Sequence, residues 1–184
     1  MEAISAKIYS HAHYISGEGA NLIFELTNHT KKPVHILKWN TPLEGLKSDC
    51  LHVLKNGKTV AYDGRLVKRG QPKPKDFLLL EPGKSVSAKV DIGEGYNMSD
   101  SGRVHVNYKS DNLIYSRETP TQEFLMSMPN RKTTDKAIKV IAKPATFNLT
   151  GKSRGVLTAG EKARSLEKKK KSPKKKLSPL QNWD

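Results

Sequence analysis

Short runs of alternating apolar and polar residues, separated by turn residues, constrain the fold of this chain more than any other feature. Residues 4–8, 85–90 and 102–108 each place apolar side chains at every second position, the period of a strand with one buried face. About eight such strand candidates follow one another at short spacing, with almost no helical periodicity. This pattern predicts an all-β domain, an immunoglobulin-like antiparallel β-sandwich.

The pair Asn56-Gly57 gives the strongest local turn signal. It stands between two short apolar runs at residues 51–54 and 59–61. Asn-Gly favours a type I′ turn, in which both central residues need a positive φ. We therefore expect a β-hairpin here. Two longer stretches, residues 41–49 and 62–76, lack a strand pattern and are expected to be loops or excursions at a sheet edge.

The end of the chain differs in composition from the rest. Residues 151–184 hold 11 basic and three acidic residues, and they have few apolar ones. Residues 1–150 hold 22 basic and 15 acidic residues. We therefore predict a β-sandwich domain over residues 1–150 and a largely disordered, basic tail over residues 151–184.

Seven lysines lie within ten residues of this tail. They are Lys168, Lys169, Lys170, Lys171, Lys174, Lys175 and Lys176. Like charges at this density repel one another and favour a polyanion as partner, nucleic acid among them. A tail that only adds solubility is the alternative interpretation.

A series of motifs in the predicted domain resembles a known family. The motifs are Leu37-Lys38-Trp39-Asn40-Thr41-Pro42-Leu43-Glu44-Gly45, Tyr62-Asp63-Gly64, Val67-Lys68-Arg69-Gly70, Asp76-Phe77 and Pro82-Gly83. They are similar to the N-terminal β-sandwich of deuterolysin-like and peptidyl-Lys zinc endopeptidases, which belongs to the propeptide region of the precursor. The resemblance covers about residues 1–110. It implies a zinc metalloprotease as a protein partner.

The catalytic signature of these proteases is missing from the chain. They need His-Glu-x-x-His, in which two histidines bind zinc and the glutamate acts on the bound water. None of the six histidines here is followed by glutamate. Other nucleophile, phosphate-loop and metal-cluster motifs are missing too. The sequence therefore predicts a non-catalytic protein without a metal or a cofactor.

Four residues of the stretch 62–76 are the predicted partner-binding residues. They are Tyr62, Asp63, Lys68 and Arg69. The Asp63-Gly64 turn is expected to present Tyr62 outward, and loops carry binding residues more often than strands do. Trp39 is expected instead to lie in the core at the end of a strand.

Two functions remain open at this stage. The first is a protein-binding module, in one version a detached prodomain that binds, chaperones or inhibits a metalloprotease. The second is a nucleic-acid-associated protein that binds non-specifically through its tail. The first residues do not resemble a signal peptide and no run is long enough to cross a membrane, so the predicted location is cytoplasmic, or nuclear in a eukaryotic cell.

Overall fold

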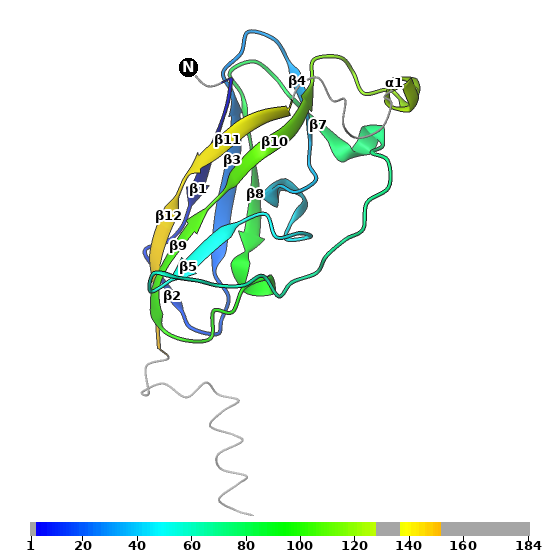
Figure 1. The fold of residues 1–184 in the computed structure, drawn as a ribbon. Coiled ribbons are helices and arrows are strands. Elements are labelled where there is room, and N and C mark those ends of the chain that lie inside the picture. The colour runs from blue at the N-terminus through cyan, green and yellow to red at the C-terminus, as the bar shows by residue number, and fades with distance from the viewer. Residues whose placement is uncertain (1–2, 128–136, 152–184) are drawn as a thin grey trace, which may run out of the picture. The chain divides into compact units, whose positions relative to one another are not determined.

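Two β-sheets form the fold in a computed structural model of the chain, which describes residues 3–127 and 137–151 (Figure 1). The seven-stranded sheet has the order β7 (Phe77–Leu80), β4 (Val34–Leu37), β10 (Lys109–Ser116), β11 (Ala137–Lys143), β1 (Ile4–Tyr9), β3 (Asn21–Asn28), β8 (Ser85–Asp91). The five-stranded sheet has the order β2 (His13–Ile15), β12 (Ala145–Thr150), β9 (Gly102–Asn107), β5 (His52–Lys55), β6 (Lys58–Thr59). Short helices are η1 (Pro42–Glu44), η2 (Pro74–Asp76), η3 (Ile92–Glu94) and α1 (Gln122–Ser127). The predicted all-β sandwich is confirmed.

The core lies between the sheets, where the alternating strands place their apolar side chains. Ile4, Ala6 and Ile8 of β1 are buried and the residues between them are more exposed, as the alternation predicts. Phe24 and Tyr108 pack edge to face with ring centroids 4.9 Å apart. Burial of a side chain as large as Phe24 contributes about 1.5–3 kcal/mol to folding. The buried apolar side chains between the sheets therefore contribute most of the stability of the sandwich.

Two pairs of neighbouring strands run parallel, which the prediction of an antiparallel sandwich did not foresee. β1 pairs with β11 in parallel, and β2 pairs with β12 in the same way. The chain leaves β11 at Lys143 and begins β12 at Ala145, in the other sheet. Pro144 stands between them and has no N–H to continue a ladder. β1 and β11 are therefore neighbours in the seven-stranded sheet, and the strands that follow them in the chain, β2 and β12, are neighbours in the five-stranded sheet.

The hairpin at Asn56-Gly57 forms as predicted. Asn56 has a φ of 52° and Gly57 a φ of 78°, the two positive values that a type I′ turn requires. The turn joins β5 to β6 and also docks on β9. There Asn56 N–H donates to the Arg103 carbonyl at 2.8 Å, and Asn56 Oδ1 accepts from Arg103 N–H at 2.9 Å.

Two long connections cross from one sheet to the other. The first covers residues 38–51 between β4 and β5, and the second covers residues 60–76 between β6 and β7. Both are loops, as the sequence predicts, with η1 in the first and η2 in the second. None of the helices in the described part of the chain is long and apolar enough to span a membrane.

The chain divides after Gly151 into one unit over Met1–Gly151 and another over Lys152–Asp184. Residues 152–184 lie outside the described residues. The predicted lysine cluster falls there in full, so its role as a polyanion site stays a prediction.

Candidate binding surface at the two inter-sheet loops

The two crossing connections, residues 38–51 and residues 60–76, are called the loop pair. Backbone hydrogen bonds join them at two places. Val67 N–H donates to the Lys47 carbonyl at 3.1 Å, and Lys38 N–H donates to the Asp76 carbonyl at 3.0 Å. The second connection is therefore fastened near its middle and at its end.

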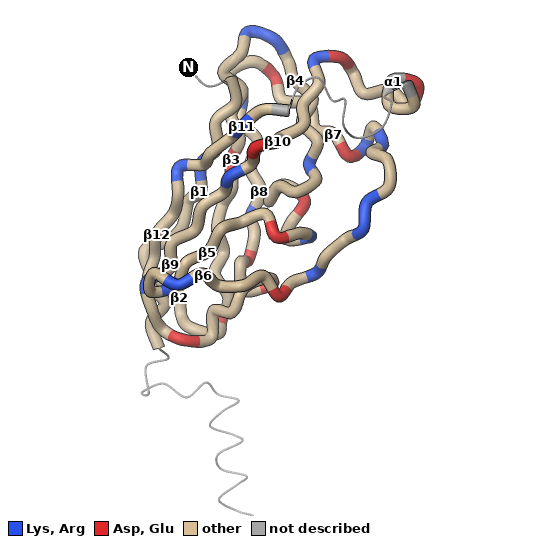
Figure 2. Tube along the Cα trace, in the orientation of Figure 1, with Lys and Arg blue, Asp and Glu red and all other residues tan. Residues whose placement is uncertain are grey.

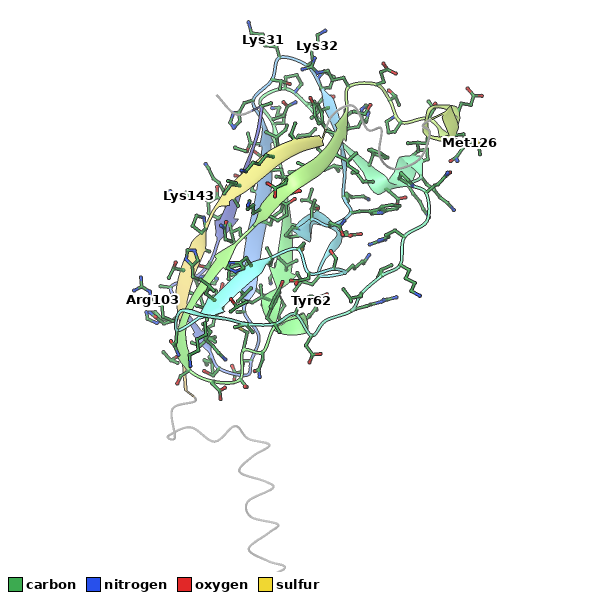
Figure 3. The ribbon with its side chains drawn as sticks, viewed as in Figure 1. Lys31, Lys32, Tyr62, Arg103, Met126 and Lys143 are labelled. Carbon is green, nitrogen blue, oxygen red and sulfur yellow. The ribbon has the colours of Figure 1, made fainter. Side chains whose placement is uncertain are left out.

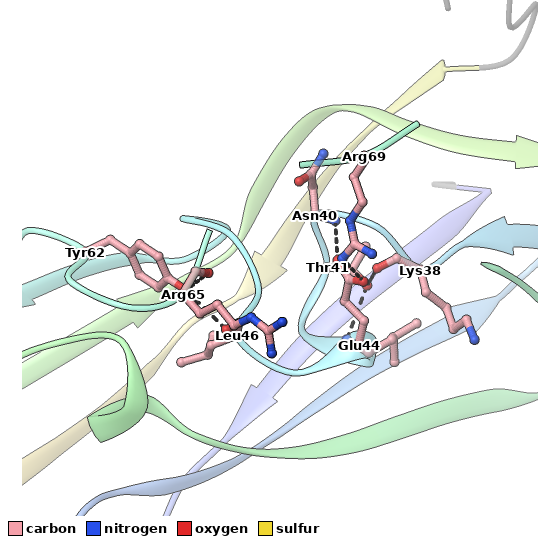
Figure 4. Close-up of polar contacts among 9 residues, drawn as sticks. Lys38, Asn40, Thr41, Glu44, Leu46, Tyr62, Arg65 and Arg69 are labelled. Carbon is pink, nitrogen blue, oxygen red and sulfur yellow. Dashed lines mark hydrogen bonds and ion pairs between the residues drawn. The ribbon is translucent and has the colours of Figure 1, made fainter. Parts of the chain in front are cut away.

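Tyr62 lies at the start of the second connection and points inward, so the prediction that it faces outward is wrong. Its hydroxyl lies 3.1 Å from the Leu46 carbonyl and 2.8 Å from the Arg65 carbonyl (Figure 4). Its ring packs edge-on against Tyr96, with centroids 5.3 Å apart. An amphipathic tyrosine gains more from apolar contact plus two nearby acceptors than from full solvation, which explains the orientation.

Two glycines make room for the Tyr62 ring. A Cβ on Gly64 would lie 2.6 Å from the ring carbon Cζ, and one on Gly95 would lie 2.4 Å from Cε2. Gly95 also accepts a hydrogen bond from Asp63 N–H at 2.8 Å. The chain bends at Gly64, and the missing side chains of Gly64 and Gly95 leave the space that the Tyr62 ring occupies.

Arg69 fastens the same connection through its side chain. Its guanidinium binds the carboxylate of Glu44, whose side chain is only 8% exposed (Figure 4). The guanidinium also lies 5.1 Å from the centre of the Trp39 ring. Glu44 also accepts a hydrogen bond from Asn40 N–H at 3.1 Å. A cation that stacks on an aromatic ring and pairs with a shielded carboxylate is well held. Arg69 is thus mainly an anchor between the two loops.

The prediction that Trp39 lies in the core at the end of a strand is wrong. β4 ends at Leu37, and Trp39 lies in the turn that follows, half-buried under Arg69. Asn40 has a φ of 58°, which turns the chain away from the strand direction at this point.

Asp63 and Lys68 face solvent, together with two residues that the sequence analysis missed. Leu66 is 72% exposed, and Arg65 beside it is exposed too. Lys73 and Lys75 add exposed positive charge further along, and Figure 2 shows basic residues recurring along this stretch. The outer side of the connection is therefore a basic strip around one exposed leucine.

The four predicted binding residues thus divide into two kinds. Tyr62 and Arg69 hold the backbone, and Asp63 and Lys68 are displayed by it. Their role in binding stays a prediction. Leu66 could not be found from the sequence, because a leucine between Arg65 and Val67 carries the same signal as a core residue.

Cys50 lies half-buried in the first connection. Burial raises the pKa of its thiol to about 12, so the nucleophilic thiolate is scarce at neutral pH. Burial and a hydrogen bond to Asp49 raise the pKa of Tyr96 as well. Within residues 3–127 and 137–151, no three His, Cys, Asp or Glu side chains lie close enough together to hold a metal.

Comparison with known proteins gives one partial match to report. Over 83 residues the chain is 36% identical to an extracellular protease of Aeromonas hydrophila. The match covers 45% of this chain and 24% of that protein, so the chain spans about a quarter of the relative's length. No family model matches the chain. The similarity is consistent with a protease-related region.

The same relative contradicts the predicted location. The cytoplasmic or nuclear location rested on the lack of a recognisable signal peptide. The relative is an extracellular protease, which points to a secreted protein instead.

Proposed function

We propose that this chain is a non-catalytic, protease-associated module that binds a secreted zinc endopeptidase through the loop pair, as a detached prodomain would. The observation that carries the proposal is that residues 60–76 are held in place by contacts while part of them faces solvent. They form a long irregular connection that is fastened by Tyr62, Val67 and Arg69 while Leu66 and Lys68 face solvent.

Such a connection has the properties of a protease-binding loop. Protease–inhibitor interfaces change little on association, because their loops are already held in the bound conformation. Fastening a loop in advance lowers the entropy lost on binding and so increases affinity. The similarity to an extracellular protease supports a partner of this kind. Binding would leave the protease inhibited, chaperoned or both.

Inhibition of an extracellular protease tests the proposal. The full chain is titrated into the Aeromonas hydrophila extracellular protease, and hydrolysis of a peptide substrate is followed. We expect inhibition at micromolar concentration or below, weakened about tenfold or more by Leu66→Asp, because an unpaired carboxylate is costly to bury against a partner.

A matched control separates binding from general surface change. Ile23 on β3 is also an exposed apolar residue, and Lys89 faces it across the sheet, so Ile23→Asp introduces the same charge with little strain. This variant is expected to inhibit like the wild type. Equal inhibition by Leu66→Asp and the wild type would remove the loop pair from the interface. No binding at micromolar concentration would refute the function.

The tail supports a second candidate function. Seven lysines within ten residues would bind nucleic acid or another polyanion without sequence preference. This candidate is independent of the loop pair, and both functions are compatible in one chain.

A further inference from the structure

The outer face of the five-stranded sheet contains a hollow of about 290 Å³. It lies over β5, β9 and β12 beside the Asn56-Gly57 turn. Its lining residues are Leu54, Asn56, Gly57, Arg103, His105 and Thr146. None of them is acidic, and four of them carry side-chain hydrogen-bond donors.

The strand register explains why these side chains meet. Leu54 and Thr146 lie on either side of His105 in directly paired positions, so the three form one row across the outer face. Val53 and Val104, one position away, are buried on the other face. The half-buried Leu54 therefore gives the hollow an apolar wall beside its polar groups.

Arg103 is the charged group of the hollow. Its side chain is exposed and projects away from the ribbon at this end of the sheet (Figure 3). Its guanidinium takes no part in the ion pairs found among the described residues. A guanidinium presents paired N–H groups that match the oxygens of a carboxylate or a phosphate.

Two neighbouring side chains are held in place around it. His105 Nδ1 and Thr146 Oγ1 are hydrogen-bonded at 3.0 Å, which fixes the plane of the imidazole and leaves Nε2 for another contact. Asn56 Oδ1 accepts from Arg103 N–H, and within the described residues its side-chain NH₂ group forms no hydrogen bond. Gly57 has a positive φ and no atom within 4 Å of where a Cβ would lie, so the entrance of the hollow is open at this residue.

We propose that this hollow is a binding site for an oxyanion carried on a larger group, with Arg103 as the anchoring residue and His105 and Asn56 as further donors. The hollow has room for more than a free ion, because a single water needs only about 10–15 Å³ of such space. Leu54 would contact the carbon part of the ligand. The oxyanion is a carboxylate or a phosphate, and the site is separate from the loop pair.

Anion titration followed by NMR tests the site in the full chain. Inorganic phosphate and acetate are added separately at constant ionic strength, with chloride as the compensating ion. We expect saturable shifts centred on the amides of Asn56, Gly57, Arg103 and His105. Tighter binding of phosphate assigns the site to phosphoryl groups, and tighter binding of acetate assigns it to carboxylates.

Variants decide whether Arg103 carries the binding. Arg103→Gln should weaken it about tenfold, because a hydrogen bond to a charged group is lost. Arg103→Lys should retain part of it, since the charge remains without the paired N–H groups. Lys89→Gln on the other sheet removes the same charge and should leave anion binding unchanged.

Two results would overturn the proposal. The first is a response to both anions that never saturates or that is spread over lysines throughout the surface. The second is Arg103→Gln binding as tightly as the wild type. Arg103 is exposed, so the variant is expected to keep the wild-type melting temperature, and a loss of binding then reports on the site.

Discussion

The ring of Tyr62 stands edge-on to the ring of Tyr96, with centroids 5.3 Å apart and planes at 66°. The two residues also form an isolated antiparallel bridge. Tyr96 is buried, and its hydroxyl lies 2.7 Å from the Leu51 carbonyl. The connection of residues 60–76 is therefore joined to the core by an aromatic pair at a point where strand pairing has ended.

Removal of the Tyr62 hydroxyl should loosen this connection without unfolding the domain. Tyr62→Phe keeps the ring contact but leaves the Leu46 and Arg65 carbonyls without this hydroxyl. We expect a loss of about 1 kcal/mol in the free energy of unfolding, measured in urea. Hydrogen exchange at the Val67 amide should become faster. Tyr9→Phe is the control, because the Tyr9 hydroxyl bonds Glu25 at an exposed site; an equal loss in both variants would contradict the role of Tyr62.

Replacement of Arg69 should lower the free energy of unfolding more than Tyr62→Phe does. Arg69→Met leaves the Glu44 carboxylate shielded from solvent without its cation. We expect a loss of about 2 kcal/mol, less than for a fully buried pair because the arginine is partly exposed. Lys68→Met, at the exposed neighbouring position, should change stability by about 0.5 kcal/mol or less.

A double-mutant cycle isolates the Arg69–Glu44 interaction. Arg69→Met combined with Glu44→Gln removes both charges, and the double variant should be more stable than the sum of the two single losses predicts. Additive losses, measured by urea unfolding, would show that the two side chains do not interact in solution.

The strands were predictable because their signal is local. In β1 and β9, apolar and polar residues alternate along the strand, so the pattern is visible within six residues. The Asn56-Gly57 turn needs two positive φ values, which few other residue pairs accept. The parallel pairing of β1 with β11 was not predictable. These strands are far apart in sequence, and no local pattern selects one partner strand over another.

The binding surface was predicted in part for the same reason. At Asp63-Gly64 the chain bends at Gly64, but the direction of Tyr62 depends on Gly95, 33 positions away in the chain, which leaves space for its ring. The sequence around Glu44 carries no sign of a partner in residues 60–76. Only the fold brings Arg69 to it and reveals that the pair joins two loops.

Alkaline pH should destabilise the protein in part through Cys50. Its pKa is about 12 in the folded state and 9.0 for an unperturbed thiol, so above pH 9 the unfolded chain loses a proton that the folded chain retains. Stability from this group is therefore complete below pH 9 and is lost as the pH rises toward 12. The maximal slope is about 1.4 kcal/mol per pH unit.

Cys50→Ala provides the measurement for this effect. The free energy of unfolding of the variant and the wild type is compared from pH 8 to pH 11 in urea. The buried tyrosines titrate in both proteins. Besides burial, which raises the pKa of Tyr62, Tyr96 and Tyr108 most, the Cys50 thiolate raises it too, so the difference in slope reports Cys50 together with this coupling. Identical slopes, or rapid modification of the folded thiol by a disulfide reagent at pH 8, would contradict a shielded thiol.

The lysine cluster should make polyanion binding steeply dependent on salt. Seven phosphate contacts give a slope of about −6 in a plot of log K against log salt concentration for duplex DNA, which is a loss of about a thousandfold or more between 50 and 200 mM salt. Replacement of all seven lysines at positions 168–171 and 174–176 by glutamine in the full chain should remove most of this slope. Lys31→Gln with Lys32→Gln, at the exposed turn between β3 and β4, is the control and should leave it nearly unchanged. Fluorescence anisotropy of a labelled duplex measures both variants. If the seven-glutamine variant bound DNA as tightly as the wild type, the basic strip on residues 60–76 would become the next candidate for the contact.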